Sequence, residues 1–321
     1  MSNDLISVVI PTFNREKLVT RSIKSVLNQT LKNIEVVVVD DGSTDNTENA
    51  IKKIKDKRIK YYKLKKNSGA CYARNFGISK SKGKYIAFQD SDDVFHKDKL
   101  EKQLKNLLLN DSDLDFCRIC LKFMNDFLVP TDSQIKGFTE GGYISELCRG
   151  NFISTQTILA KKSVFEDISF DNSLPRFQDY DLILRIMTKY KMSYTNKVLV
   201  DLYKEDNTIG SSSSKLRKAC LIMLKKKFDL EPVQEDLLID NLAFWLKKDK
   251  IDSLDDRYFD LVSEHNELIS NYKNLEKAFF KLQNENKSLN FEFNELRSNY
   301  NAIVNSKRWK FLVKVMNFFG K

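Results

Sequence analysis

The chain has 321 residues, of which 41% are hydrophobic and 31% charged, and its formal net charge is +10. This length allows at least one full domain core, and no apolar run reaches the roughly 20 residues needed to cross a bilayer. The lysines are dispersed and no nucleic-acid-binding motif is present, so nucleic acid is not expected as a partner. Residues 1–4 lack the basic start of a secretory signal, and the five cysteines are an odd number. Together they predict a cytoplasmic protein with buried, reduced thiols.

Strand and helix patterns alternate over the first 90 residues. Short apolar, β-branched runs predict strands at 6–10, 34–39, 59–64 and 84–88. Helices are predicted between them at 15–29, 44–55 and 69–79. This alternation predicts an α/β fold with a Rossmann-like, mainly parallel sheet flanked by helices. Because such crossovers are right-handed, the carboxyl ends of the strands would meet at one edge.

Carboxylates gather where two of these strands end. They are Asp40 and Asp41 after the second strand, and Asp90, Asp92 and Asp93 after the fourth. The first strand is expected to end at Pro11, because proline cannot continue a central strand. Clustered acids at a buried strand end are costly without a positive charge. Mg²⁺ or Mn²⁺ would supply that charge while keeping substrate phosphates in its shell. The alternative is a solvated acidic loop before the next helix.

Four short motifs follow one another in the first 95 residues. They are VVIPTFNR at 8–15, VDDGSTD at 39–45, the pattern Asn67-x-Gly69-x4-Arg74-Asn75-x-Gly77, and DSDD at 90–93. In order and spacing they are similar to the motifs of the family 2 inverting glycosyltransferases. The likeness extends over roughly residues 5–210. It implies a GT-A fold, a nucleotide-diphosphate-sugar donor and a divalent metal.

The resemblance implies a nucleotide-sugar site made of Pro11, Thr12, Asn14, Asp40, Asp41, Arg74, Asp90 and Ser91. In this site Asp41 would accept a hydrogen bond from the base, while Asp40 supports its loop. A carboxylate that faces an imide N–H favours uracil or thymine over cytosine, whose N3 is no donor. A UDP-sugar is therefore the expected donor, with a dTDP-sugar as the alternative.

The resemblance also implies a metal site. Asp92 would bind Mn²⁺ or Mg²⁺ between the two phosphates, with Asp90 and Asp93 as further candidate ligands. Many relatives carry a histidine near the metal where this chain has residues 205–206, a Glu-Asp pair, so the aspartate there would replace it or the role is absent. Arg74 would face the pyrophosphate or pair with an acid on a neighbouring helix, and both alternatives remain open.

The segment RFQDYDLILR at 176–185 resembles the family's Glu-Asp motif at the start of a helix. Gln178 replaces the usual glutamate, whereas the aspartate is retained as Asp179, which would be the catalytic base. The start of a helix favours an ionised carboxylate that can accept a proton. The alternative is that Asp179 only caps the helix.

Together these features predict a metal-dependent inverting glycosyltransferase. It would move a sugar from a UDP-sugar to a hydroxyl of a glycan or lipid-linked glycan acceptor in surface-polysaccharide biosynthesis, at the cytoplasmic face of the inner membrane. One alternative is a nucleotidyltransferase, although residues 11–15 supply no glycine-rich phosphate loop. A second is a catalytically degenerate scaffold, an idea supported by Gln178 and the missing histidine.

The transferase domain (1–210) is expected to be followed by a helical extension (211–250) and a coiled coil (251–304). Every seventh residue of the coiled coil is apolar: Leu254, Leu261, Leu268, Leu275, Leu282, Leu289, Leu296 and Ile303. Asn286 at an inner a position favours a homodimer, while aromatic residues at the other a positions would permit a trimer. The apolar, aromatic and basic residues 305–321 predict a tail that binds an anionic membrane surface. Packing of this tail on the catalytic domain is the alternative.

Overall fold

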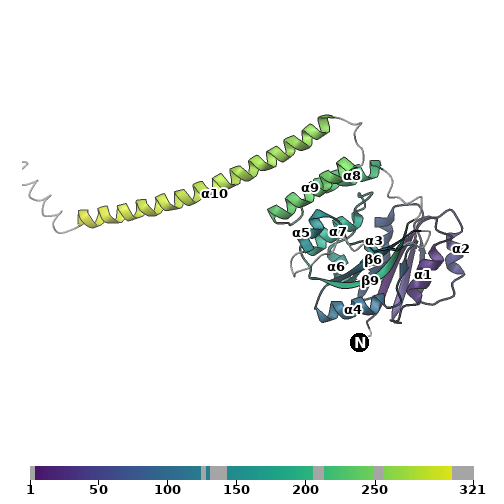
Figure 1. Ribbon diagram of the computed structural model, residues 1–321. Coiled ribbons are helices and arrows are strands. Elements are labelled where there is room, and N and C mark those ends of the chain that lie inside the picture. Colours follow the sequence, from purple (N-terminus) through teal and green to yellow (C-terminus); the bar gives the residue numbers. More distant parts are fainter. Residues whose placement is uncertain (1–3, 124–127, 131–142, 205–212, 249–255, 306–321) are drawn as a thin grey trace, which may run out of the picture. The chain divides into compact units, whose positions relative to one another are not determined.

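The computed structural model describes residues 4–123, 128–130, 143–204, 213–248 and 256–305. The chain divides into two compact units, Met1–Ile251 and Asp252–Lys321. The first contains a sheet with its covering helices, and the second contains one long helix (Figure 1). The finer boundaries expected at residues 210 and 304 remain predictions.

The described strands form a single nine-stranded sheet. They are β1 (Ile6–Thr12), β2 (Ile34–Asp40), β3 (Ile59–Lys63), β4 (Tyr85–Phe88), β5 (Val94–Phe95), β6 (Leu114–Phe123), β7 (Leu128–Pro130), β8 (Ile158–Lys161) and β9 (Met192–Lys204). Their order is β3-β2-β1-β4-β8-β6-β9-β5, and β7 pairs with β6. All pairs among β1 to β4 are parallel, whereas β8 runs antiparallel to β4 and β6. The predicted α/β sheet is confirmed, with parallel pairing throughout its first half and mixed pairing in its second.

Helices cover both faces of this sheet. They are α1 (Val19–Leu27), α2 (Thr47–Lys52), α3 (Ala70–Lys80), α4 (Lys99–Leu109), α5 (Tyr143–Arg149), α6 (Lys162–Asp167), α7 (Gln178–Met187), α8 (Ser213–Leu224) and α9 (Pro232–Lys248). Side chains alternate between the two faces of a strand. Ile6, Val8 and Ile10 of β1 therefore share one hydrophobic core with residues of α1 and α4. On the other face, α3 packs against Val9 and Val39.

Gly77 brings α3 close to the sheet. A Cβ atom at this position would lie 2.4 Å from Val9 Cγ1 and 3.2 Å from Val39 Cγ2, so no larger residue fits without a shift. Arg74 lies one turn earlier on the same face of α3. The close approach at Gly77 therefore fixes the distance of Arg74 from the sheet. This explains in physical terms why the third motif has a glycine at this position.

The first strand runs further than expected. β1 continues through Pro11 to Thr12, so the prediction that Pro11 ends it is wrong. The pairing of β4 with β1 stops at Val9. One edge of β1 is open beyond that point, and a proline is tolerated there because no ladder hydrogen bond is lost. The loop after β1 thereby starts level with Asp40, the partner of Thr12 in the β1–β2 ladder.

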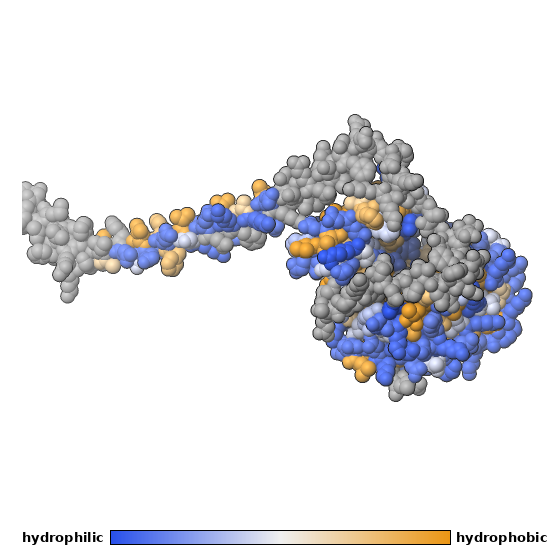
Figure 2. All heavy atoms as spheres, in the orientation of Figure 1, coloured by the Kyte–Doolittle hydropathy of each residue, from blue (hydrophilic) through white to orange (hydrophobic). Residues whose placement is uncertain are grey.

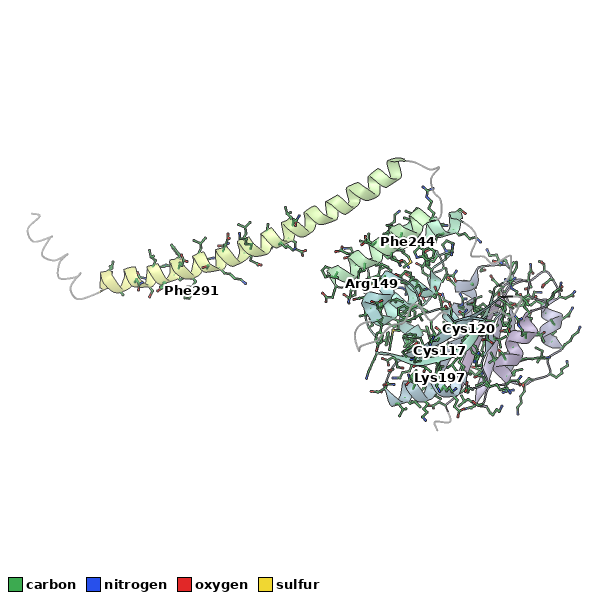
Figure 3. The ribbon with its side chains drawn as sticks, in the orientation of Figure 1. Cys117, Cys120, Arg149, Lys197, Phe244 and Phe291 are labelled. Atoms are coloured by element: carbon green, nitrogen blue, oxygen red, sulfur yellow. The ribbon has the colours of Figure 1, made fainter. Side chains whose placement is uncertain are left out.

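The five cysteines are all buried and none forms a disulfide, which confirms the prediction. Cys117 and Cys120, the pair with C-x-x-C spacing, both lie on β6 (Figure 3). Burial raises the pKa of the Cys117 thiol to about 12. A thiol held protonated in this way is a packing residue rather than a nucleophile or metal ligand.

The second unit contains α10 (Asp256–Asn305), a continuous helix of 50 residues. Four leucines of the heptad stripe are largely exposed in the single chain: Leu275 (73%), Leu282 (63%), Leu289 (64%) and Leu296 (73%). Hydrophobic side chains appear orange along the helix in Figure 2. Among the described residues, none of the helices combines the length and the apolar character that a membrane span requires. The residues 205–206 and 306–321, for which roles were predicted, lie outside the described part of the chain.

Candidate active site

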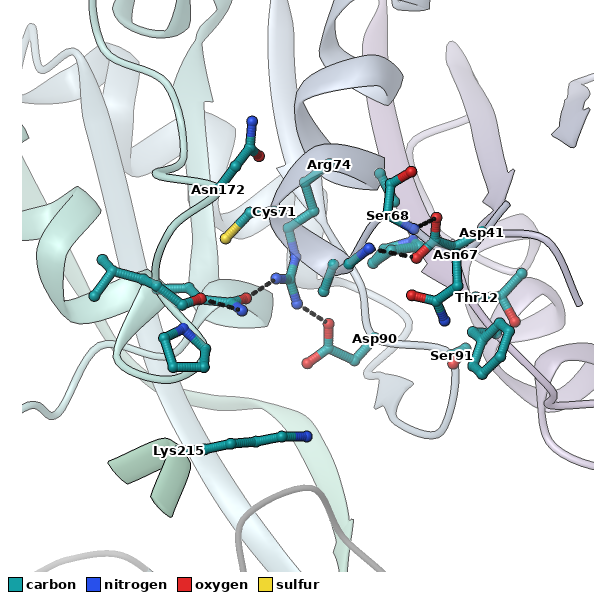
Figure 4. A pocket seen from close by; sticks show the side chains of 18 of the residues that line it. Thr12, Asp41, Asn67, Ser68, Cys71, Arg74, Asp90, Ser91, Asn172 and Lys215 are labelled. Atoms are coloured by element: carbon teal, nitrogen blue, oxygen red, sulfur yellow. Dashed lines mark hydrogen bonds and ion pairs between the residues drawn. The ribbon is translucent and has the colours of Figure 1, made fainter. Parts of the chain in front are cut away.

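A cavity of about 770 Å³ opens where the parallel strands end (Figure 4). Its wall includes the predicted residues Pro11, Thr12, Asn14, Asp41, Arg74, Asp90, Ser91 and Asp92. The loops after β1, β2 and β4 meet there because parallel strands place their carboxyl ends at one edge. Asp40, Asp93 and Asp179 are not on the wall of the cavity. The contacts of Asp40 and Asp93 explain why, and Asp179 is described separately below.

Asp41 joins the loop after β2 to the start of α3. Its carboxylate accepts hydrogen bonds from the backbone N–H groups of Ser68 (2.8 Å) and Gly69 (2.7 Å). Burial raises the pKa of Asp41, against the two N–H donors, which lower it. The neighbouring Gly42 has a φ of +79°, and a Cβ there would lie 2.9 Å from the backbone of Lys66. The carboxylate thus stands on a tightly packed pair of loops with its remaining lone pairs toward the cavity.

Asp40 holds the same loop from beneath. Its side chain is fully buried and accepts hydrogen bonds from the Ser43 N–H at 2.8 Å and the Tyr61 hydroxyl at 2.7 Å. Both carboxylate oxygens are therefore engaged within the protein. This is the arrangement expected of a residue that supports the loop and does not contact a ligand itself.

Arg74 links the two sides of the cavity. Its guanidinium donates to Asp90 Oδ1 (2.8 Å) and to Gln178 Oε1 (2.9 Å). Its acidic partner lies on the loop after β4, not on a neighbouring helix, and Arg74 still lines the cavity. Its Nε is buried without a hydrogen-bond partner among the described residues. The residue that departs from the family pattern, Gln178, therefore serves as a neutral acceptor for Arg74.

Basic residues of the first half surround Asp92. Arg15 Nε lies 3.9 Å from Asp92 Oδ2. The guanidinium of Arg21 donates to the backbone carbonyl of Asp92 and stacks over the Tyr203 ring, with 3.8 Å between Cζ and the ring centroid. The backbone around Asp92 is thus fixed from α1 and β9, while its carboxylate remains on the cavity wall.

Asp93 points away from the cavity. Its buried carboxylate accepts hydrogen bonds from Gln156 Nε2 at 2.8 Å and from the Tyr203 N–H at 3.0 Å. Burial, followed by the charges of Asp90 and Asp92, raises the pKa of Asp93 to about 8. These contacts tie the acidic loop to the second half of the sheet, and they do not favour the predicted metal-ligand role of Asp93.

The remaining two acids fit a hard divalent cation. Asp90 and Asp92 both present carboxylates to the cavity. Among the described residues no three His, Cys, Asp or Glu side chains come close enough to form a metal cage. Mg²⁺ and Mn²⁺ do not require one, since one or two carboxylates together with substrate phosphates complete their shell. The residues present therefore suit a metal that binds together with a phosphorylated substrate.

Asp179 lies in the first turn of α7, after Phe177, which has a φ of +59°. Its Oδ1 accepts hydrogen bonds from the Tyr180 N–H at 2.8 Å and from Asn151 Nδ2 at 3.1 Å. Oδ2 has no partner among the described residues. Burial raises the pKa of Asp179, while the nearby positive charge of Arg74 lowers it. One oxygen is therefore held in place and the other is available to accept a proton.

Asp181, two residues later, is a useful contrast. It is fully buried, and its two oxygens are paired with Arg185 (2.5 Å) and Lys226 (2.5 Å). Both oxygens of Asp181 are thus occupied by cations, and neither is available to accept a proton from a substrate. Of the two acids in the first turn of α7, only Asp179 has the contacts expected of a catalytic base.

Several residues of the cavity wall were not predicted as site residues. Those from the second half are Asn172, Ser173, Leu174, Pro175, Gln178, Lys215 and Lys218. They lie in the loop before α7, at the start of α7 itself and on α8. Apart from Gln178 they belong to no recognised motif, and Asn151 likewise lies in a variable stretch without a pattern. Only the tertiary structure could bring them to the cavity.

The comparison with known families decides the identity of the chain. The model of the family described as "Glycosyl transferase family 2" matches residues 7–169, about half of the chain. The chain is a family 2 glycosyltransferase. The family predicted from the four motifs is confirmed.

Individual relatives of this glycosyltransferase agree with the assignment. An uncharacterized glycosyltransferase of Rickettsia conorii is 37% identical over 201 residues, which cover 62% of the chain and 33% of the relative. The chain thus spans about a third of the length of its rickettsial relatives. The Escherichia coli protein named UDP-Glc:alpha-D-GlcNAc-diphosphoundecaprenol beta-1,3-glucosyltransferase WfaP is 31% identical over 216 residues, 67% of the chain and 82% of that protein.

A solved structure with a bound nucleotide sugar supports the GT-A fold. The crystal structure of S. aureus TarS 1-349 in complex with UDP-GlcNAc matches this family 2 glycosyltransferase with a TM-score of 0.59 and 25% sequence identity. The match covers 74% of the chain and 71% of TarS 1-349. The predicted α/β GT-A fold is therefore confirmed, and the C-terminal coiled coil stays a prediction.

Proposed function

We propose that this enzyme transfers a sugar, with inversion, from a UDP-sugar to a hydroxyl group of a lipid-linked glycan in surface-polysaccharide biosynthesis. The proposal rests on one cavity, whose wall combines Asp41 with the carboxylates of Asp90 and Asp92. The base candidate Asp179 lies near Arg74, which is on the same wall. The UDP-GlcNAc bound by TarS and the UDP-Glc and diphosphoundecaprenol in the name of WfaP support these substrate classes.

Asp41 and Thr12 would recognise the uracil end of the donor. Each oxygen of Asp41 has one backbone donor and keeps a lone pair, so it can accept a further hydrogen bond from an imide N–H. Thr12 Oγ1 is buried on the cavity wall without any hydrogen-bond partner in the described protein. A buried hydroxyl without a partner is costly, and a bound nucleotide would satisfy it.

Asp90 and Asp92 would hold Mg²⁺ or Mn²⁺ against the donor diphosphate. The bound metal would neutralise the negative charge that develops on the departing diphosphate. The protein's part is to fix the two carboxylates through Arg74 and Arg15. Arg74 in addition holds the diphosphate side of the cavity at a constant distance from the start of α7, through Gln178.

Asp179 would act on the acceptor. Its free Oδ2 would take the proton of the acceptor hydroxyl, whose oxygen then forms a bond to C1 of the sugar. The bond between C1 and the diphosphate oxygen breaks on the opposite face, and the electron pair leaves with UDP. One displacement of this kind inverts the anomeric centre. Asn151 and the Tyr180 N–H would keep Asp179 oriented throughout.

The second unit would place the enzyme at its acceptor. A single α10 leaves its leucine stripe in water, and we infer that a second copy of the chain covers it as a parallel coiled coil. The basic tail at 305–321 would bind the cytoplasmic face of the inner membrane, where a lipid-linked acceptor resides. Two tails in a dimer bind a surface more tightly than one.

Donor binding and donor hydrolysis test the proposal. The purified full-length chain is mixed with UDP-, dTDP- and GDP-sugars with and without Mn²⁺, and its melting temperature and nucleoside diphosphate release are measured. A ligand that binds only the native state raises the melting temperature. We expect the largest rise and UDP release with a UDP-sugar in the presence of metal. Release of no nucleoside diphosphate from any donor would contradict the proposed activity and favour the scaffold alternative.

A further inference from the structure

The helix α8 directs two lysines toward the cavity. Lys215 and Lys218 lie three residues apart, on one side of α8, and both line the cavity wall. In Figure 4 the Lys215 side chain reaches into the cavity from the side opposite Asp41. Asp41, where the uracil would bind, and the two lysines thus lie on opposite sides of the cavity, with Asp90 and Arg74 between them.

The position of these lysines is fixed by the rest of α8. Its opposite face is buried through Leu216, Ala219, Cys220 and Met223, at helical spacing. Just after the helix, the Lys226 ammonium forms ion pairs with Asp171 at 2.6 Å and with Asp181 at 2.5 Å. The helix is therefore anchored along one face and at its C-terminal end.

Electrostatics distinguish the pair from the other cations of the cavity. Arg74 is paired with Asp90, and Arg15 lies near Asp92. Lys215 and Lys218, by contrast, have no acidic partner among the described residues, and the first turn of α8 contains no acid. Two unpaired ammonium groups repel each other, and the N-terminal end of a helix adds further positive potential. Such a site favours an anion that carries more than one negative charge.

We propose that Lys215 and Lys218 form a diphosphate-binding pair. Lysine is a compact point charge that suits phosphate oxygens. The diphosphate comes from one of two sources, the UDP-sugar donor or an acceptor attached to lipid through a diphosphate. This inference rests on the proposed function for the identity of these two substrates, but the binding of a diphosphate by the pair is testable without either of them.

Inorganic pyrophosphate is the first probe. Its binding to the full-length chain is measured by calorimetry in EDTA, so that a metal at Asp92 does not contribute. The double variant Lys215→Gln, Lys218→Gln is compared with Lys225→Gln, Lys227→Gln, which removes the same charge from two exposed lysines outside the cavity. We expect pyrophosphate binding to weaken by at least about tenfold in the first variant only, since hydrogen bonds to charged groups are lost. Equal binding by the two variants, or no binding by the wild type, overturns the proposal.

UDP and uridine then distinguish the two sources. If the pair holds the donor diphosphate, the Lys215, Lys218 variant binds UDP about tenfold more weakly and uridine unchanged. If it holds the acceptor diphosphate, UDP affinity is unchanged, and KM rises for a diphosphate-linked lipid acceptor but not for a glycan without diphosphate. Failure of the proposed function has a separate signature, because the wild type would release no UDP while pyrophosphate binding still depended on the two lysines. Melting temperatures equal to those of the control variant would show that both double variants are folded.

Discussion

The two halves of the sheet contribute to the cavity in different ways. In the first half, parallel strands end together, and the residues that follow β1, β2 and β4 form the wall directly. In the second half, pairing is mixed, and the wall comes from the loop at 172–175 and from helices α7 and α8. The proposed donor side is thus set by the sheet itself, whereas the proposed acceptor side is set by loops and helices outside the sheet.

The largest expected effect concerns the second half. Asp179→Asn keeps the shape and most hydrogen bonds of the side chain but removes its ability to accept a proton. We expect kcat to fall by about 10²–10⁴ with donor affinity nearly unchanged. Steady-state kinetics and UDP titration measure the two quantities. Asp181→Asn is the control on the same helix. Because it breaks contacts with Arg185 and Lys226, it should mainly lower the melting temperature and have a much smaller effect on kcat. Near-normal turnover after the Asp179→Asn substitution would assign the base to another residue.

The pH dependence of kcat in the wild-type enzyme tests the role of Asp179 in a second way. Burial raises the pKa of Asp179, and a base must be ionised in order to act. Activity should therefore fall as pH decreases through this raised pKa, at a higher pH than an exposed aspartate would give. A kcat profile that stays flat down to pH about 4, the range of an ordinary carboxylate, would be inconsistent with Asp179 as the base.

The donor half is tested at the acidic loop. Asp92→Ala should reduce UDP affinity measured with Mn²⁺ to the value that the wild type has in EDTA, a loss on the order of tenfold or more. Asp93→Asn is the neighbouring control, since Asp93 points away from the cavity. It should leave the metal dependence of UDP binding in place. An Asp92 variant whose affinity still depends on the metal would remove Asp92 from the metal site.

Glycines from the two halves should differ in their tolerance of a methyl group. Gly77→Ala places a Cβ 2.4 Å from Val9 Cγ1. This overpacking should lower the unfolding free energy by about 1–3 kcal/mol. A gain in helix propensity of up to about 1 kcal/mol should offset part of that loss. Gly150→Ala, after α5, meets no atom within 4 Å and should be nearly neutral. Urea denaturation of both variants gives the comparison, and equal stability of the two would show that the α3–sheet contact can relax.

The smallest effect on catalysis is expected from removal of the second unit. A chain truncated after Lys250 should transfer sugar to a soluble acceptor at the wild-type rate. Light scattering should give about twice the 37.4 kDa chain mass for the full-length protein and a monomer for the truncated one. A full-length monomer at micromolar concentration would rule out self-pairing of α10.

Sequence reasoning located the donor half well, because its residues follow directly from the strands. Asp41, Asp90 and Asp92 come immediately after apolar runs, so a parallel sheet has to bring them together. The sequence does not reveal contacts that depend on the tertiary structure. Nothing local distinguishes Asp93 from Asp92, yet Gln156 and Tyr203 draw Asp93 away from the cavity.

The residues that the second half of the sheet and its helices contribute could not be predicted from the sequence either. Asn151 donates a hydrogen bond to Asp179, and Lys215 lines the cavity. Both residues come from stretches of sequence that have no motif. Pro11 is the opposite case, in which a sound local rule gave the wrong end for β1, because the rule assumes neighbours on both edges of the strand. Each error therefore traces to a neighbour that the sequence pattern does not reveal.

The bond between Arg74 and Gln178 has a consequence for the timing of turnover. It joins the two halves across the cavity through one hydrogen bond of 2.9 Å, from the charged guanidinium of Arg74 to the uncharged amide of Gln178. A glutamate at position 178 would turn this bond into an ion pair, which is stronger because both partners would then be charged. With glutamine less energy is needed to break this link than with glutamate, so we expect UDP to be released faster than from a Gln178→Glu variant.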